Sequence, residues 1–447
     1  MTAVALPRAR SALGMLAAIG AAMLALTCAQ DSLHISGELG IGSDDRLAAF
    51  VALGAISAAF YAAAVALVLW GALPSGAVWV VLAGAVLLRT VPLAAPSFLS
   101  SDLYRYVWDG EVQNAGINPY RFIPADPALN SLRDSVIYPS INRAGYAPTI
   151  YPPAAQAVFA AVARLSATPY AMKLAMAGFE ALGILVMLRL LKRAALPPAQ
   201  LLIYAWNPVF IWEYAGNGHV DAMVIGLLAL ALLAASGRRG SFAGLAIAAA
   251  TLTKLLPLVL FPALWGSRRW RMAALFAGTI AAGYACYASV GWRVLGFLPG
   301  YASEEGIGSG SGLYPIRLMA ALVDVPSWAG LVWLAAVACM LAACAFRMVW
   351  FVTPPTDDAD HIRRLGADAL LLAGIVTIGL TPHYAWYFGW LSFLACLAPW
   401  RSMIWLTLAC GLLYLDPIHT GLWQPALLYA PCLVLAIRDY ALSARRD

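Results

Sequence analysis

Long apolar segments recur along this chain and are separated by short polar or basic turns. The first three, 11–30, 47–71 and 76–95, reach the length of about 20 residues that a helix needs to cross the hydrocarbon core of a membrane. In lipid, every backbone N–H and C=O must be paired within the protein, which leaves helices or closed barrels. The segments are rich in Ala and Leu and do not alternate with period two, so helices are favoured.

The composition agrees with lipid as the main solvent. The chain has 447 residues, of which 62% are hydrophobic and 11% charged, whereas a soluble domain carries about a quarter of charged residues. We therefore expect one all-α polytopic membrane domain over 1–447, with roughly 11–13 transmembrane helices. The seven cysteines form no CxxC pair and are interpreted as small buried hydrophobes, not as disulfides or metal ligands.

The basic residues predict the orientation of the chain. The net charge of +6 does not indicate a nucleic-acid partner, because the basic residues lie in turns between apolar segments, as in cytoplasmic loops. Arg8 and Arg10 precede the apolar run 12–28, which resembles a signal peptide; the many later segments favour a first transmembrane helix. With these arginines inside, the polar segment 96–151 is extracytoplasmic, and the protein is a multi-pass protein of the inner (plasma) membrane.

The middle of the chain allows two topologies. Its apolar segments are 154–168, 170–192, 201–215, 221–235 and 241–266. If all five cross, Arg193 and Arg238 fall outside. If 154–168 only dips into the membrane and 241–266 is a broken hairpin, both arginines fall inside. The second topology obeys the positive-inside bias and is preferred.

Segment 96–151 is the longest polar stretch, and it opens with a group of charged residues. Asp102 follows directly on a span, where a carboxylate can take a proton from a hydroxyl beside a lipid head group. Arg105 and Asp109 lie three and seven residues on, which places them on the same face of a helix. Arg105 can pair with Asp102 or bind phosphate through its planar guanidinium. The alternative is an interfacial helix with solvated charges and an aromatic belt.

These residues resemble a known family. The pattern Asp-x-Tyr-x-Tyr-x-x-Asp-Gly contains Tyr104, Gly-x-Asn-Pro-Tyr contains Asn118 and Tyr120, and Tyr-Pro-Pro begins at Tyr151. Together they are similar to the first extracytoplasmic loop of GT-C class glycosyltransferases. The closest likeness is to bacterial polyprenyl-phosphate-mannose-dependent mannosyltransferases, and a more distant one is to the first mannosyltransferase of GPI-anchor synthesis. The resemblance covers most of residues 95–390.

The resemblance implies a GT-C-like helical bundle whose catalytic loop is 96–151. It implies an inverting transfer of a hexose, with mannose expected, from a polyprenyl-phosphate donor to a lipid or glycan acceptor. Asp102 corresponds to the family's general base, and Asp109 would orient the acceptor or a metal. A divalent metal cofactor is left open, because the Asp-x-Asp spacing of the GPI enzyme is absent here. An extra hairpin precedes the loop, compared with family members whose loop follows the first span.

Three further charged residues interrupt apolar stretches. His219 and Asp221 follow Gly216 and Gly218, and glycines let a backbone approach a ligand closely. A His beside a carboxylate can be held charged and stabilise a leaving phosphate; the alternative is a buried His–Asp pair or a turn. Lys254 lies within a strongly apolar run and is expected to contact the lipid phosphate, with snorkelling to a head group as the alternative.

Two later segments add candidates for donor or acceptor binding. Glu304 and Glu305 precede a Gly-Ser run that can close over a sugar or serve as a plain linker. His383 and Tyr384 lie at an outer membrane boundary, where aromatic residues also form belts. Lys173 and Glu180 lie seven residues apart in an apolar run, and we expect them to neutralise each other across the bundle.

Two other classes of function compete with a glycosyltransferase. A transporter or flippase should show paired broken helices in matching halves, whereas polar residues here gather in one loop. A polysaccharide polymerase or ligase that uses lipid-linked oligosaccharide should carry a large Arg-rich loop late in the chain, and the late loops here are short and poor in Arg. The sequence therefore favours a membrane glycosyltransferase that works with membrane lipids.

Overall fold

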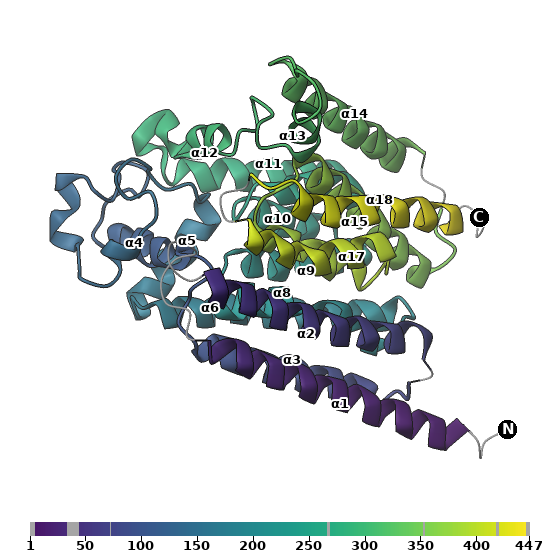
Figure 1. Cartoon of the computed structure of the whole chain (residues 1–447). Helices are drawn as coiled ribbons and strands as arrows, with labels where there is room; N and C mark the ends of the chain where they lie inside the picture. The colour runs from purple at the N-terminus through teal and green to yellow at the C-terminus, as the bar shows by residue number, and fades with distance from the viewer. Residues whose placement is uncertain are drawn as a thin grey trace.

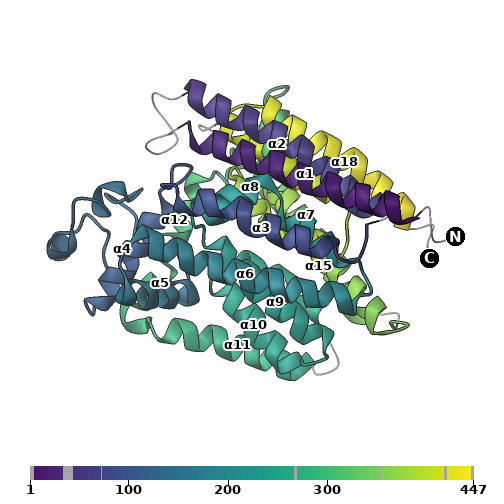
Figure 2. The same ribbon diagram turned by 90° about the horizontal axis from the view of Figure 1, so that it is seen from below.

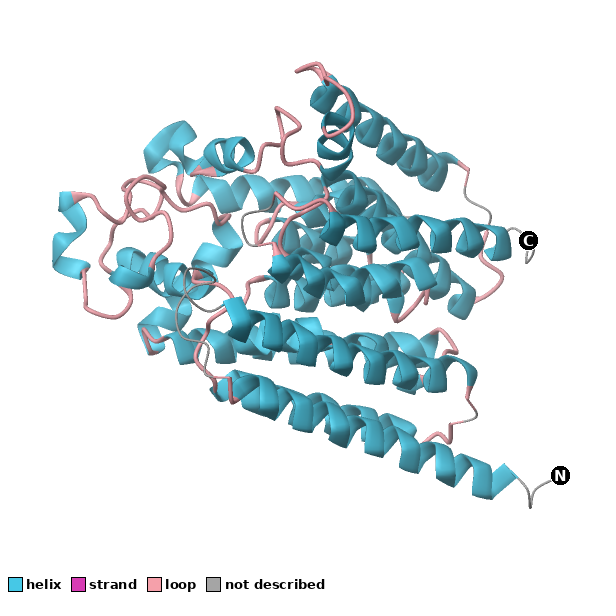
Figure 3. Cartoon of the chain, in the orientation of Figure 1, coloured by secondary structure: helices cyan, strands magenta, loops and turns pink. Residues whose placement is uncertain are grey.

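The computed structural model describes residues 5–33, 44–71, 73–265, 269–351, 354–416 and 420–443. Within these ranges the regular elements are all helices, and no strand is present (Figure 3). The predicted all-α polytopic class is confirmed.

The α-helices follow one another along the whole described chain. The first part of the chain contains α1 (Ala5–Asp31), α2 (Asp44–Trp70), α3 (Ala77–Ala94), α4 (Asp102–Asn114), α5 (Pro153–Leu165), α6 (Pro169–Arg193), α7 (Leu202–Ala205), α8 (Pro208–Phe210), α9 (Asp221–Ser236) and α10 (Gly240–Thr251). The second part contains α11 (Arg269–Ala285), α12 (Leu298–Glu304), α13 (Tyr314–Ala320), α14 (Ala329–Trp350), α15 (Asp358–Leu380), α16 (Gly389–Ala395), α17 (Arg401–Ala409) and α18 (Trp423–Ser443). Short 3-10 helices lie at Pro127–Leu132, Tyr138–Ser140, Pro198–Leu201, Leu256–Leu264, Ala288–Leu295, Ala385–Phe388 and Cys410–Leu415, and a π-helical turn at Ile211–Gly216.

Among the described residues, five helices are long and apolar enough to cross a membrane unaided. They are Ser11–Asp31, Asp45–Trp70, Ala77–Ala94, Pro169–Arg193 and Ala329–Trp350. Two bent pairs, Pro208–Gly216 with Asp221–Ser236 and Trp270–Ala285 with Ala288–Glu304, raise the number to seven. The expected 11–13 spans also counted apolar segments that form short or broken helices, such as Pro153–Leu165 and Gly240–Thr251.

The helices leave the polar segments at one end of the bundle. Figures 1 and 2 both show the start of α1 and the end of α18 at one end, with α4, α5 and α12 at the opposite end. Much of segment 96–151 therefore lies at the opposite end of the bundle from the start of α1 and the end of α18, while its side of the membrane stays a prediction.

Contacts in the middle of the chain join helix ends that the preferred topology places on the same side of the membrane; the topology itself stays a prediction. Arg193 at the end of α6 donates from Nη1 to Ser236 Oγ at the end of α9 over 2.7 Å. At the other end of α9, Asp221 binds Lys254, which lies in the break after α10. The break after Thr251 and the 3-10 helix Leu256–Leu264 interrupt the predicted segment 241–266, of which 241–265 are described. The short α5 packs on α4, where Phe159 stacks on Tyr106 with ring centroids 4.6 Å apart.

Two buried charges in the bundle have partners that differ from the prediction. Glu180 binds Arg89 of α3 at 2.7 Å and accepts a hydrogen bond from Tyr204. Lys173 Nζ donates to the carbonyl oxygens of Pro92 and Ala95. The expected Lys173–Glu180 pair is therefore wrong. Both residues lie on α6, but each finds a partner on α3 or at the end of α3.

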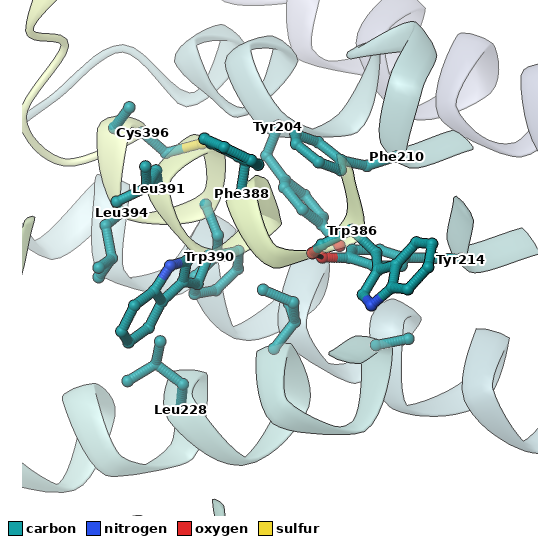
Figure 4. Packing of buried hydrophobic residues seen from close by; sticks show 14 of the residues in the cluster. Tyr204, Phe210, Tyr214, Leu228, Trp386, Phe388, Trp390, Leu391, Leu394 and Cys396 are labelled. Carbon is teal, nitrogen blue, oxygen red and sulfur yellow. Dashed lines mark hydrogen bonds between the residues drawn. The ribbon is translucent and has the colours of Figure 1, made fainter. Parts of the chain in front are cut away.

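A tightly packed aromatic core supports the end of the bundle that carries the polar segments. Figure 4 shows Tyr204, Phe210, Tyr214, Trp386 and Phe388 in this cluster. Phe210 and Tyr214 stack at 5.6 Å, and the Tyr214 hydroxyl donates to the Trp386 carbonyl. These contacts fix the segment around Trp386, which also forms one wall of the cavity described below.

Candidate functional site

A cavity of about 520 Å³ lies at the polar end of the bundle. Its walls come from the start of α4, the loop before α5, the start of α9, the break after α10, α12, and the segment from α15 to Tyr387. Eight of the residues predicted from the sequence line this cavity: Asp102, Arg105, Tyr151, Asp221, Lys254, Glu305, His383 and Tyr384. Segments far apart in the chain therefore meet at one chemically dense site.

Asp102 is the first residue of α4 and projects from that helix terminus. A carboxylate is favoured there by the unpaired N–H groups and the helix dipole. The backbone N–H of Asp102 donates to Ser100 Oγ, and Asn142 Nδ2 donates to Asp102 Oδ1 over 2.9 Å. The side chain keeps 22% of its surface exposed. Asp102 is therefore held in place on one oxygen while remaining open to the cavity.

Arg105 and Asp109 brace α4. They form an ion pair of 2.8 Å, and the Asp109 carboxylate also accepts hydrogen bonds from Thr149 Oγ1 and Gln156 Nε2. Asp109 is almost fully buried and does not line the cavity. Arg105 reaches the cavity wall, but its guanidinium is also held by the Ala147 carbonyl. This network ties α4 to the loop and to α5.

The motif tyrosines and asparagine have mainly structural partners. Asn118 Nδ2 donates to the Tyr287 carbonyl, and its Oδ1 accepts from the backbone N–H of Tyr120. The Tyr120 hydroxyl donates to the Tyr151 carbonyl over 2.7 Å. Tyr104 packs half-buried against the hydrophobic core. Of these four residues, only Tyr151 lines the cavity.

Lys254 is held between a carboxylate and an aromatic ring. Its Nζ lies 2.8 and 2.9 Å from the two oxygens of Asp221, and 3.6 Å from the centroid of the Tyr387 ring. The helix ends before Lys254, so the ammonium points into the cavity region and not along the lipid face. An ammonium over an aromatic face is a cation–π contact, which adds to the ion pair.

His219 lies behind Asp102 and does not line the cavity. Its Nδ1 is 3.9 Å from Asp102 Oδ2, and its Nε2 is 3.2 Å from Glu213 Oε2. The ring stacks on Trp386 with centroids 4.1 Å apart. The His219–Asp221 pair suggested by the sequence does not form, because Asp221 begins α9 and turns toward Lys254.

The two glutamates before the Gly-Ser run face different residues. Glu305 lies 3.3 Å from His383 Nδ1, and His383 Nε2 lies 2.8 Å from the Gly312 carbonyl. Both ring nitrogens therefore face acceptors. Glu304 instead binds Arg143 at 2.7 Å and lies outside the cavity lining. The pKa of Arg143 is lowered by burial and raised more by Glu304, so it stands above its ordinary value.

Four functional candidates were missed by the sequence analysis. Asn142 and Arg143 lie 40 residues or more after Asp102, beyond α4 and a largely irregular segment, and no periodic pattern places them beside it. Tyr387 was not singled out, because aromatic residues at a membrane boundary also form belts. Glu213 carried a usable signal, since an ionisable residue in an apolar segment is a functional candidate by default.

The cavity carboxylates do not suit a divalent metal. Asp102 is bound by Asn142, Asp221 by Lys254 and Glu305 by His383. In the described part of the chain, no three His, Cys, Asp or Glu side chains gather as ligands for a metal ion. We therefore derive no catalytic step through a metal.

Fold and site together define a polytopic membrane protein that carries a charged, aromatic cavity at the edge of its helical bundle. A family model described as "Alpha-(1->6)-mannopyranosyltransferase, N-terminal domain" matches residues 9–267, more than half of the 447 residues. The chain belongs to this family and is a membrane glycosyltransferase, specifically a mannosyltransferase. No curated protein matches the chain. The matched region includes Asp102, Asp221 and Lys254.

Proposed function

We propose that this protein transfers mannose from a polyprenyl-phosphate donor to a hydroxyl of a lipid or glycan acceptor. The reaction takes place at the extracytoplasmic face of the inner membrane and inverts the configuration of the anomeric carbon. One observation carries the proposal: Asp102 shares its cavity with the side chains of Arg143, Lys254 and His383. A base and a set of cations around one space are what displacement of a phosphate by a hydroxyl requires.

In the proposed reaction Asp102 is the general base. Asn142 occupies Oδ1, which leaves Oδ2 for the proton of the acceptor hydroxyl. The acceptor oxygen attacks the anomeric carbon from the face opposite the phosphate, the glycosidic C–O bond breaks, and its electron pair leaves with the polyprenyl phosphate. A positioned base typically contributes about 10²–10⁴-fold in rate.

Lys254, Arg143 and His383 stabilise the departing phosphate. Each has a carboxylate partner at rest, so the phosphate competes with Asp221, Glu304 or Glu305 for the cation. Stabilisation of developing charge is worth about 3–4 kcal/mol per donor. Arg105 is a weaker candidate, because it is committed to Asp109.

The rest of the cavity wall suits a lipid-linked sugar. Aromatic rings, including Tyr151, Tyr301 and Tyr384, offer faces on which a sugar can stack. Leucines at 255, 256 and 298 line the same space and supply an apolar surface for the first isoprene units.

The test is Asp102→Asn in membranes supplied with radiolabelled polyprenyl-phosphate mannose. We expect transfer to fall at least about 10²-fold while the protein accumulates and melts normally. The matched control is Asp358→Asn, an exposed carboxylate in the first turn of α15, which should leave transfer unchanged. Full activity in Asp102→Asn would remove the general base from the proposal.

The donor and the stereochemistry need separate measurements. A panel of polyprenyl phosphates carrying mannose, glucose, galactose or arabinose should give transfer with mannose well above the others. Nuclear magnetic resonance of the product should show an anomeric configuration opposite to that of the donor. Retained configuration would contradict a single displacement.

A further inference from the structure

His219 is a buried imidazole placed between two carboxylates. Its side chain is 1% exposed, Nδ1 faces Asp102 Oδ2 at 3.9 Å, and Nε2 faces Glu213 Oε2 at 3.2 Å. Neither ring nitrogen has a hydrogen bond of good geometry in the described structure. A buried polar group without a hydrogen-bond partner destabilises the folded protein, so this arrangement needs an explanation. The transfer reaction proposed above does not use this residue.

The backbone around His219 is built to hold this position. The chain forms a π-helical turn over Ile211–Gly216, and Gly218 then adopts φ +66°. π-helical turns are rare in proteins overall, and those that occur are often found at functional sites. This positive φ favours glycine, and a Cβ on Gly218 would also lie 2.8 Å from a methyl group of Leu103 in α4. This turn brings Glu213 and His219 together within six residues of sequence.

The same turn is fastened to the segment that leads into Asp102. Asn217 Oδ1 accepts hydrogen bonds from the backbone N–H groups of Phe98 and Leu99, over 3.2 and 3.1 Å. Asp102 follows three residues after Leu99. The position of the imidazole relative to the carboxylate is therefore set by backbone contacts and not by flexible side chains alone.

Glu213 is fully buried and is supplied with donors suited to a carboxylate. The Tyr414 hydroxyl donates to Oε1, and Asn217 Nδ2 donates to Oε2 over 3.2 Å. The remaining neighbour of Oε2 is His219 Nε2, so the tautomer that suits this site carries its proton on Nε2. Nδ1 then presents a lone pair toward Asp102.

Trp386 fixes the plane of the imidazole. The two rings stack at 18° with centroids 4.1 Å apart. An aromatic face also stabilises a cation placed against it. The other charged or titratable side chains around this pair come from several elements: Asp102 and Tyr106 from α4, Lys173 from α6, Tyr214 from the π-helical turn, Asp221 from α9 and Tyr414 from the Cys410–Leu415 helix.

We propose that His219, backed by Glu213, is a positioning residue that accepts the proton taken up by Asp102. This proposal rests on the transfer reaction proposed above. In it, Asp102 Oδ2 receives the proton of the acceptor hydroxyl and passes it to His219 Nδ1. The imidazolium lies between the carboxylates of Asp102 and Glu213. After the product leaves, the proton returns through Asp102 to water or to the polyprenyl phosphate in the cavity, so no proton is gained or lost. The 3.9 Å separation shortens when substrate is bound, as is common for catalytic hydrogen bonds.

The decisive measurement is the pH profile of kcat for His219→Gln, compared with the wild-type protein and with the control His361→Gln from α15. Glutamine can still face Glu213 but cannot accept the proton. We expect kcat to fall about 10–100-fold with the donor KM within about twofold of wild type. The acid limb of the profile should move to lower pH, because one titrating group is gone. A substitution that affected only packing would leave the position of the acid limb unchanged.

Glu213→Gln is the second variant. It keeps the size of the side chain and removes the charge that holds the imidazolium, so its acid limb should also move to lower pH, while Glu213→Asp should restore part of kcat. If His219→Gln fails to accumulate in the membrane, the Glu213→Gln profile alone decides. Wild-type kcat and an unchanged acid limb in these variants overturn the relay.

The two proposals fail in different ways. Activity retained in Asp102→Asn sinks the general base and the relay together. Activity lost in Asp102→Asn but preserved, with an unchanged pH profile, in His219→Gln sinks the relay alone.

Discussion

The ammonium of Lys254 lies within 2.9 Å of both carboxylate oxygens of Asp221, a residue 33 positions earlier in the chain. The pair joins the break after α10 to the start of α9 and is largely shielded from solvent. Breaking a buried pair leaves one uncompensated charge, whereas removing both charges is tolerated far better. Comparing a variant of Lys254 alone with a variant of both residues can therefore separate a structural role of Lys254 from a catalytic one.

Lys254→Met should reduce kcat for mannosyl transfer about 10²-fold, because the departing phosphate loses one cation. It should also lower the free energy of unfolding by about 3 kcal/mol through the stranded Asp221. The double variant Lys254→Met, Asp221→Asn should recover most of the thermal stability and none of the transfer rate. Recovery of transfer in the double variant would show that Lys254 acts only in packing.

We expect substitutions of Arg143 and of Glu304 to have unequal effects on kcat, although the two residues form an ion pair. Arg143 lines the cavity and Glu304 does not. Arg143→Gln should lower kcat about 10-fold or more, while Glu304→Gln should change kcat less than twofold. Both side chains keep about 30% of their surface exposed, so either change should alter the free energy of unfolding by less than about 1 kcal/mol. Arg121→Gln, an exposed loop arginine, is the matched control.

The pH dependence of this pair follows from the raised pKa of Arg143. A cation whose pKa is higher in the folded state contributes stability below its unfolded pKa and loses it as the pH rises through the folded value. Both values lie above the range of a transfer assay. Thermal stability attributable to Arg143 should therefore be flat from about pH 6 to 9. A loss of the difference between wild type and Arg143→Gln within that range would contradict the assignment.

Asp109 should behave as a structural residue. Its carboxylate is buried against Arg105, Thr149 and Gln156. Asp109→Asn leaves the Arg105 charge without its partner and should lower the free energy of unfolding by about 3–5 kcal/mol, measured by thermal unfolding in detergent. Asp102→Asn should lower it much less. A variant of Asp109 that melts like wild type yet fails to transfer would instead support the acceptor-orienting role expected from the sequence.

The sequence predicts the fold class and the family well, because both depend on local signals, whereas the roles of the site residues stay predictions. Apolar length predicts membrane helices, and the pattern that starts at Asp102 led to the family that the match over 9–267 then showed. The count of spans was less predictable, since α5 and α10 are apolar yet end at 13 and 12 residues. Nothing in a hydropathy pattern distinguishes a crossing helix from a half-crossing one that packs on a loop.

The partners of the charged residues could not be predicted, because tertiary packing chooses them. His219 and Asp221 are two residues apart, yet they face different carboxylate and ammonium groups across the site. Glu180 similarly turns to Arg89, which is 91 residues away. Spacing along a helix reports which side chains share a face, but not which neighbouring helix supplies the stronger partner.

The mutual neutralisation of the cavity's charges has a consequence for which molecules can enter. Lys254, Arg143 and His383 each have a carboxylate close by, so the resting cavity exerts little net attraction on a small anion. We therefore expect inorganic phosphate or a water-soluble sugar nucleotide to gain too little binding free energy there to displace the three carboxylates. The polyprenyl-phosphate donor proposed above is held by the bilayer at high local concentration, and we expect it to make that exchange. With that donor, we expect the enzyme to discriminate against soluble competitors through membrane retention of the substrate alone.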